Sequence, residues 1–131
     1  MAFQKKRMFT EGELDFMKIL WDKGEAKPEE IRQELNKIGR PVNFGTIRNI
    51  LIVMIEKGYV KRKRKGKAYL YRALIDEEKA KKNMAQHLLK RLFGGSESLL
   101  MGALLKNRDV SRKELDEIEL LIAERKKSSK K

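Results

Sequence analysis

Residues 43–74 contain two adjoining segments whose residue patterns predict a helix followed by a hairpin. The first is Phe44-Gly45-Thr46-Ile47-Arg48-Asn49-Ile50-Leu51, and the second is Gly58-Tyr59-Val60-Lys61-Arg62-Lys63-Arg64-Lys65-Gly66-Lys67-Ala68-Tyr69-Leu70-Tyr71. Asn43 is a helix-starting residue, and four apolar residues recur at helical spacing before Lys57: Ile47, Leu51, Met54 and Ile55. In the second segment, two β-prone ends flank a cationic tip with a glycine, which predicts a β-hairpin. Val60, Leu70 and the tyrosines supply the hairpin face expected to pack on the helices.

Two more helices are predicted ahead of this stretch. A capping box, Thr10-Glu11-Gly12-Glu13, opens the first helix, and Gly24 ends it. Its apolar side chains recur at helical spacing: Leu14, Met17, Leu20 and Trp21. The second helix begins at Pro28 and ends at Gly39, and its inward-facing residues are Ile31, Leu35 and Ile38. Residues 1–9 have no such periodicity, so we expect a flexible basic arm there.

The order of these elements predicts a winged helix-turn-helix domain, so the fold class is mainly α with a small β-hairpin. In such a domain the third helix enters the major groove of double-stranded DNA, and the hairpin lies along phosphate. The candidates for reading bases are Thr46, Arg48 and Asn49. Arg48 can donate bidentately to guanine and Asn49 to adenine, while Thr46 can bond phosphate or touch a thymine methyl. The same residues also fit an ordinary solvated helix face, so the prediction depends on the neighbouring hairpin.

Charge supports a polyanionic partner. The net charge is +13, from 32 basic and 19 acidic residues. Residues 1–75 contain 18 basic and 9 acidic residues, and the densest cationic run falls on the predicted hairpin tip. The candidates for phosphate contacts are Asn43, Lys61, Arg62, Lys63, Arg64, Lys65 and Lys67. The alternative is a soluble protein with Lys-rich and Glu-rich solvated faces.

Three further helices are predicted after Asp76. The first runs to about Phe93, the second follows Gly94-Gly95 and begins at Ser96, and a capping box, Ser111-Arg112-Lys113-Glu114, opens the third. Their apolar stripes are too sparse for an independent small domain, so we expect them to pair with a second copy of the chain in a homodimer. Folding back onto the DNA-binding domain is the alternative. The dimerisation candidates are Met84, Leu88, Leu92, Phe93, Leu99, Leu100, Leu104, Leu115, Ile118 and Ile122.

These patterns predict a DNA-binding domain over residues 1–75, a helical dimerisation region over residues 76–125 and a disordered tail over residues 126–131. Cysteine is absent, which excludes disulfides and thiol chemistry and fits a cytoplasmic protein. We find no apolar run long enough for a membrane span and no signal peptide. His87 is the only histidine, and no nucleophile or carboxylate pair resembles a catalytic site, so we expect no enzyme, cofactor or metal site.

Several stretches together resemble the BlaI/MecI family of penicillinase repressors over nearly the whole chain. They are Leu14-Asp15-Phe16-Met17-Lys18-Ile19-Leu20-Trp21, Gly45-Thr46-Ile47-Arg48-Asn49-Ile50-Leu51, Glu56-Lys57-Gly58-Tyr59-Val60-Lys61-Arg62, Gly66-Lys67-Ala68-Tyr69-Leu70-Tyr71 and Leu92-Phe93-Gly94-Gly95-Ser96. The resemblance implies a repressor that binds palindromic promoter DNA as a dimer through its C-terminal helices. Asn49 replaces a threonine typical of the family, and Ile52 and Val53 replace residues that are usually polar. The Asn-Phe pair cleaved in the family's β-lactam regulators is missing from residues 99–105.

The sequence is also compatible with two other functions. A non-specific nucleic-acid-binding protein, associated with chromatin or ribosomes, would depend on its lysines and would bind every sequence alike. A protein-interaction module would use Ile52 and Val53 as part of a partner surface.

Overall fold

The computed structural model describes residues 9–106 and 109–129. The predicted basic arm lies outside the described residues except for Phe9, and so do residues 130–131 of the predicted tail. Phe9 packs edge-on against Tyr59, with ring centroids 4.8 Å apart, so this residue of the predicted arm packs against the core. The chain divides into two compact units, residues 1–84 and 85–131, and each is described by itself. The division falls inside a helix, and the predicted functional boundary at residue 75 stays a prediction.

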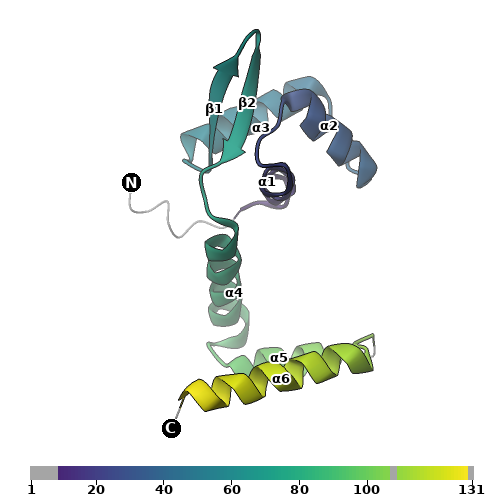
Figure 1. Cartoon of the computed structure of the whole chain (residues 1–131), viewed down its shortest axis with the longest axis vertical. Helices are drawn as coiled ribbons and strands as arrows, with labels where there is room; N and C mark the ends of the chain where they lie inside the picture. The colour runs from purple at the N-terminus through teal and green to yellow at the C-terminus, as the bar shows by residue number, and fades with distance from the viewer. Residues whose placement is uncertain (1–8, 107–108, 130–131) are drawn as a thin grey trace. The chain divides into compact units, whose positions relative to one another are not determined.

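The first unit contains three helices followed by a two-stranded antiparallel hairpin (Figure 1). The elements are α1 (Glu11–Lys23), α2 (Pro28–Lys37), α3 (Phe44–Glu56), β1 (Val60–Lys65) and β2 (Ala68–Ala73). The register runs from the pair Val60 and Ala73 to the pair Lys65 and Ala68 at the tip. Ala26, between α1 and α2, exchanges two backbone hydrogen bonds with Tyr71 and so adds a short third segment to the sheet. This arrangement confirms the predicted winged helix-turn-helix fold.

Glu13 stabilises the start of α1 through two hydrogen bonds with Thr10. The Thr10 hydroxyl accepts from the Glu13 backbone N–H at 3.0 Å, and Glu13 Oε1 accepts from the Thr10 N–H at 3.0 Å, which confirms the capping box. Glu13 Oε2 also lies 2.6 Å from Lys57 Nζ, just after the end of α3. Because the Glu13 residue is only 5% exposed, this ion pair ties α1 to α3 at the edge of the core.

The core of the first unit combines all three helices with the base of the hairpin. Its members include Phe16, Met17, Leu20, Ile31, Leu35, Ile47, Leu51, Met54, Tyr59, Val60 and Tyr71. Two inward assignments on the helices are corrected. Ile38 is 54% exposed because α2 ends before it. Leu14 is only half-buried, whereas Phe16 and Ile19 are buried, because α1 packs against both α2 and β2 and so buries a wider arc than one stripe.

Trp21 is half-buried and anchors the segment that follows the hairpin. Its indole Nε1 donates to the backbone oxygen of Ile75 at 2.9 Å. Its ring also packs edge-on against Phe9, with centroids 6.2 Å apart. The tryptophan therefore belongs to the scaffold and satisfies its polar group within the chain.

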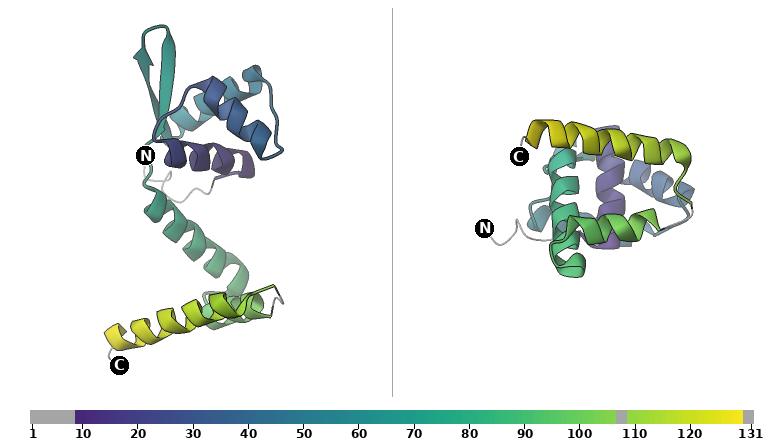
Figure 2. Two further views of the ribbon diagram at one scale, coloured as in Figure 1. Left: turned by 45° about the vertical axis from the view of Figure 1, so that its right-hand side comes forward. Right: turned by 90° about the horizontal axis from the view of Figure 1, so that it is seen from below.

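The remaining helices are α4 (Glu77–Phe93), α5 (Glu97–Leu105) and α6 (Arg112–Ser129). The predicted caps are present: the backbone N–H groups of Lys79, Leu99 and Glu114 donate to the side chains of Asp76, Ser96 and Ser111. Gly94 and Gly95 have φ values of 58° and 85°, which end α4 in a conformation that favours glycine. No described residue of α5 or α6 is buried, and the view from below shows them as two separate helices that run roughly antiparallel (Figure 2).

The last helix is longer than expected. The prediction of disorder from residue 126 is wrong for residues 126–129, because α6 continues to Ser129. The Ser128 hydroxyl donates to the backbone oxygens of Glu124 and Arg125, at 3.3 and 3.4 Å, within the last turn. Lys126 and Lys127 also lie in this turn, where positive charge suits the negative end of the helix dipole. Among the helices of the described residues, none combines the length and the apolar character needed to cross a lipid bilayer.

Candidate DNA-binding surface

The N-terminus of α3 is exposed and capped by the residue in front of it. Asn43 Oδ1 accepts from the backbone N–H of Thr46 at 2.8 Å, so this oxygen is used by the cap. The amide N–H groups of Asn43 remain as its donors toward phosphate. The Arg32 guanidinium lies 4.9 Å from the centre of the Phe44 ring, which links α2 to the first turn of α3. That turn contains no acidic residue, so the positive end of the helix dipole can face an anion.

The three candidate base readers lie together on the exposed side of α3. Thr46, Arg48 and Asn49 are all exposed, whereas Ile47, between them in sequence, is fully buried. With about 100° of rotation per residue, Asn49 falls nearly opposite the buried side, and Thr46 and Arg48 lie on either flank of it. Arg48 forms no ion pair within the part of the chain that the structure describes, so its guanidinium is available to a ligand. Their roles in reading bases stay predictions.

One face of the hairpin holds its arginines against tyrosine rings. The register pairs Arg62 with Tyr71 and Arg64 with Tyr69, which places these four side chains on one face. The guanidinium carbons of Arg62 and Arg64 lie 4.2 and 5.7 Å from the centre of the Tyr69 ring. Arg62 also donates to the Tyr71 hydroxyl at 3.5 Å, and this hydrogen bond raises the pKa of Arg62 above its usual value. The two guanidinium groups are therefore pre-oriented rather than freely rotating.

The opposite face of the hairpin is cationic and more loosely held. Lys61, Lys63 and Lys65 alternate with the arginines, and the register pairs Lys63 with Leu70. Leu70 therefore lies on this face, and the prediction that it packs on the helices together with Val60 and the tyrosines is wrong. Lys63 Nζ lies 3.8 Å from a carboxylate oxygen of Glu25. For Lys61, Lys65 and Lys67 the described residues provide no ion-pair partner, and the hairpin that carries them projects past the three helices (Figure 1).

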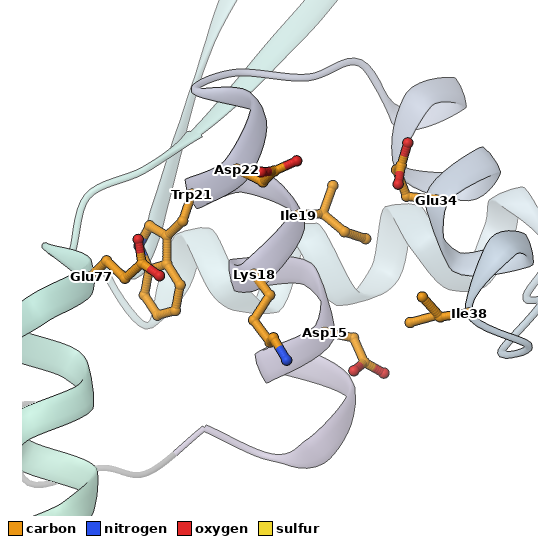
Figure 3. Close-up of a pocket in the computed structure, with 8 residues that line it drawn as sticks. All are labelled: Asp15, Lys18, Ile19, Trp21, Asp22, Glu34, Ile38 and Glu77. Atoms are coloured by element: carbon orange, nitrogen blue, oxygen red, sulfur yellow. The ribbon is translucent and has the colours of Figure 1, made fainter. Parts of the chain in front are cut away.

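A hollow lined by residues of α1, of the C-terminal end of α2 and of the start of α4 has the opposite charge. It has a volume of 510 Å³ and is lined by Asp15, Lys18, Ile19, Trp21, Asp22, Glu34, Ile38 and Glu77 (Figure 3). Four of these side chains are carboxylates and one is an amine. A hydrogen bond from Lys37, at 3.2 Å, lowers the pKa of Glu34 below its usual value, so this carboxylate is ionised at neutral pH. The hollow is therefore unsuited to nucleic acid, and DNA is favoured at the surface formed by α3 and the hairpin.

The dimerisation candidates are solvent-exposed or half-buried in the single chain. The exposed ones are Leu88, Leu92, Leu99, Leu104, Leu115 and Ile122, and the half-buried ones are Met84, Phe93, Leu100 and Ile118. Sequence reasoning left out further exposed apolar side chains: Met101, Leu105 and Leu120. It chose Leu88 by its spacing and left out Leu89, which is buried. Among the described residues, no group of three or more His, Asp or Glu side chains is arranged to hold a metal ion.

The fold and this surface define a class of protein: a winged helix-turn-helix protein with an exposed third helix, a cationic hairpin and a helical C-terminal region. The family model described as penicillinase repressor matches residues 9–124. The chain therefore belongs to the penicillinase repressor (BlaI/MecI) family, which confirms the resemblance. This is a family of transcriptional repressors and not of enzymes, so the prediction of a non-enzymatic regulator is confirmed as well.

Individual relatives agree with the family assignment. The chain is 31% identical over 106 residues to the penicillinase repressor of Staphylococcus aureus, covering 81% of this chain and 83% of that one. It is 25% identical over 127 residues to the penicillinase repressor of Bacillus licheniformis, covering 97% and 98% of the two chains. Among solved structures, the complex structure of hsRosR-SG is similar with a TM-score of 0.52 at 16% identity, covering 91% of this chain and 93% of that one. At this identity the last match supports the fold alone.

Proposed function

We propose that this chain is a dimeric repressor that binds operator DNA, with α3 in the major groove and the β1–β2 hairpin along phosphate. The observation that carries the proposal is that one compact unit contains both the exposed readers on α3 and hairpin lysines for which the described residues provide no ion-pair partner. The first group can distinguish base edges, and the second provides sequence-independent attraction. The lack of cysteine is compatible with action in the cytoplasm.

The C-terminal helices support the dimer. Ten large apolar side chains of the described part of residues 85–131 are at least 38% exposed, and α5 and α6 bury none of their residues. Burial of such side chains stabilises an association by about 25 cal/mol per Å² of apolar area. A monomer would leave all of these side chains exposed to water. Monomeric proteins rarely expose large contiguous apolar surfaces. A twofold dimer also presents two copies of α3 to the two halves of an inverted repeat.

The dimer is tested by placing charge on the exposed apolar surface. Leu99 and Leu104 are 61% and 54% exposed, so a Leu99→Glu/Leu104→Glu variant should retain its helical circular dichroism. Unpaired charge in a buried interface should raise the dimer dissociation constant by about 100-fold or more, as measured by sedimentation equilibrium. Leu74→Glu is the matched control, because Leu74 is 52% exposed in the first unit. A double variant that is still as dimeric as the control would contradict the interface.

Operator recognition is tested by selection. Fragments of the source genome that bind the purified protein at physiological salt are sequenced and compared. We expect a shared inverted repeat among them, with half-sites about one helical turn apart or a multiple of it. A collection without a shared sequence would favour the second candidate function, a non-specific nucleic-acid-binding protein, for which the net charge of +13 is the supporting observation.

A further inference from the structure

Two adjacent β-branched residues in α3, Ile52 and Val53, are 47% and 42% exposed. Neither packing in the core nor helix propensity explains why these two exposed positions carry β-branched apolar residues. The buried positions of α3 are Ile47, Leu51 and Met54, and β-branched residues are weaker helix formers than most alternatives at exposed positions. An exposed Ile-Val pair in the helix that is proposed to enter the DNA groove therefore calls for a partner.

The two side chains have different surroundings. Val53 lines a shallow, mainly apolar groove of 210 Å³ together with Thr10, Gly12, Glu13, Asn49 and Ile50. This groove lies between α3 and the start of α1, so Val53 has neighbours within the chain. Ile52 is absent from that lining. With about 100° per residue, Ile52 falls in the row of Gly45 and Asn49, on the side of α3 opposite the core.

The position of Ile52 continues the row of candidate base readers. Asn49 and Ile52 are three residues apart, which is about 4.5 Å along a helix axis. Successive base pairs are separated by about 3.4 Å, so the two side chains can meet base pairs that are adjacent or nearly so. In a projection down the helix axis, Ile52 lies between Arg48 and Asn49. One apolar side chain between two polar ones is too small to dock a protein, which takes about 800 Å² per partner.

We infer that Ile52 reads a thymine by packing against its C5 methyl group in the major groove. The inference rests on the proposed operator binding and deepens it, because it names a specificity determinant beyond the polar readers. Isoleucine has no donor for phosphate and no acceptor for a base amine. The thymine methyl is the one apolar group that base pairs present in the major groove, so it is the partner that this side chain can select.

The test removes the methyl group from the DNA instead of the protein. In the selected operator, each thymine of one half-site is replaced singly by deoxyuridine, which keeps every hydrogen-bonding group. Affinity is measured by fluorescence anisotropy. For the wild-type protein we expect a loss of about fourfold at one position, the value of one buried methyl-sized group, and little change at the others. Ile52→Ala should bind the thymine operator more weakly and should lose the sensitivity to deoxyuridine at that position.

Val53→Ala is the matched control, since it shortens the neighbouring side chain by a similar amount and should keep the wild-type response to deoxyuridine. Ile52→Val keeps a branched apolar side chain, so this variant should keep part of the wild-type sensitivity to deoxyuridine. Unchanged circular dichroism and thermal melting establish that each variant is folded. A wild-type protein indifferent to every deoxyuridine, or an Ile52→Ala variant that still responds as wild type does, would overturn the assignment of Ile52 while leaving operator binding intact. Equal affinity for operator and scrambled DNA would overturn both proposals.

Discussion

Replacing Lys61 and Lys65 with glutamine should weaken binding to every DNA sequence and make it less sensitive to salt. Both side chains belong to the cationic face of the hairpin. Within the described residues neither of them has an ion-pair partner, so their charges are not already neutralised by the protein. Each ammonium that contacts a phosphate releases a condensed counterion when DNA binds. The double variant should therefore release two fewer counterions when it binds DNA. The candidate base-reading residues on α3 are unchanged in it.

The size of the effect follows from the number of contacts. Each phosphate contact contributes about 0.9 to the slope of log affinity against log salt, so the double variant should lose about 1.8 units for each hairpin bound. Between 50 and 200 mM salt, that change in slope corresponds to about a twelvefold smaller loss of affinity than in the wild type for each hairpin bound. The ratio between operator and scrambled DNA should hardly change, because phosphate contacts do not depend on sequence.

The assay is anisotropy titration of operator and scrambled duplexes at several salt concentrations. The matched control is Lys18→Gln/Lys37→Gln, which removes the same charge beside the acidic hollow: Lys18 lines it, and Lys37 donates to Glu34 in its wall. We expect the control to keep the wild-type slope. If the hairpin variant kept its slope, or if the control variant lost as much slope as the hairpin variant did, phosphate would not lie along β1.

Three further predictions concern single residues. Arg48→Ala should reduce the discrimination between operator and scrambled DNA by about 1–3 kcal/mol, whereas an equal loss of affinity for both duplexes would argue against base reading. Glu25→Gln should raise the affinity for all DNA by about two- to fivefold, because it removes the carboxylate 3.8 Å from the Lys63 ammonium; unchanged affinity would mean that this charge does not reach phosphate. Glu13→Gln should lower the free energy of unfolding by about 1–2 kcal/mol in urea titrations, since glutamine can keep the capping box but leaves Lys57 without its carboxylate. A variant as stable as wild type would show that this ion pair contributes nothing.

The order of elements in the first unit was predictable because local chemistry marks their ends. The capping box at Thr10, Pro28 at the first position of α2 and Asn43 at the cap of α3 each satisfy a backbone requirement within a few residues. Such signals depend on neighbours in sequence and not on the rest of the fold. The winged helix-turn-helix followed from them and from the glycine-containing cationic tip.

Burial was harder to predict where an element has more than one neighbour. The buried residues Phe16 and Ile19 lie outside the stripe assigned to α1, because that helix contacts both α2 and β2. Hydrophobicity alone places Leu70 on the packed face of the hairpin, whereas the alternation that the register imposes places it on the opposite face. The separation of the arginine face from the lysine face also required the register, which starts from buried Val60 and Tyr71.

The sequence predicted which residues of the candidate site are exposed, but it did not predict which residues form ion pairs with one another. Thr46, Arg48 and Asn49 are exposed as the helical period requires. The ion pair of Lys63 with Glu25 joins residues far apart in sequence, so it had no local signal. From the sequence alone, Ile52 is only an apolar departure from the family pattern, because its placement in the row of Asn49 requires α3 to have a defined buried side.

Operator recognition requires α3 and the hairpin together to bind one particular DNA sequence. The most direct measurement is the ratio of dissociation constants for the selected operator and for a scrambled duplex of the same length and composition, at physiological salt. The proposed repressor should bind the operator at least about 1,000-fold more tightly, as sequence-specific DNA-binding proteins do. Equal dissociation constants for the two duplexes would contradict it.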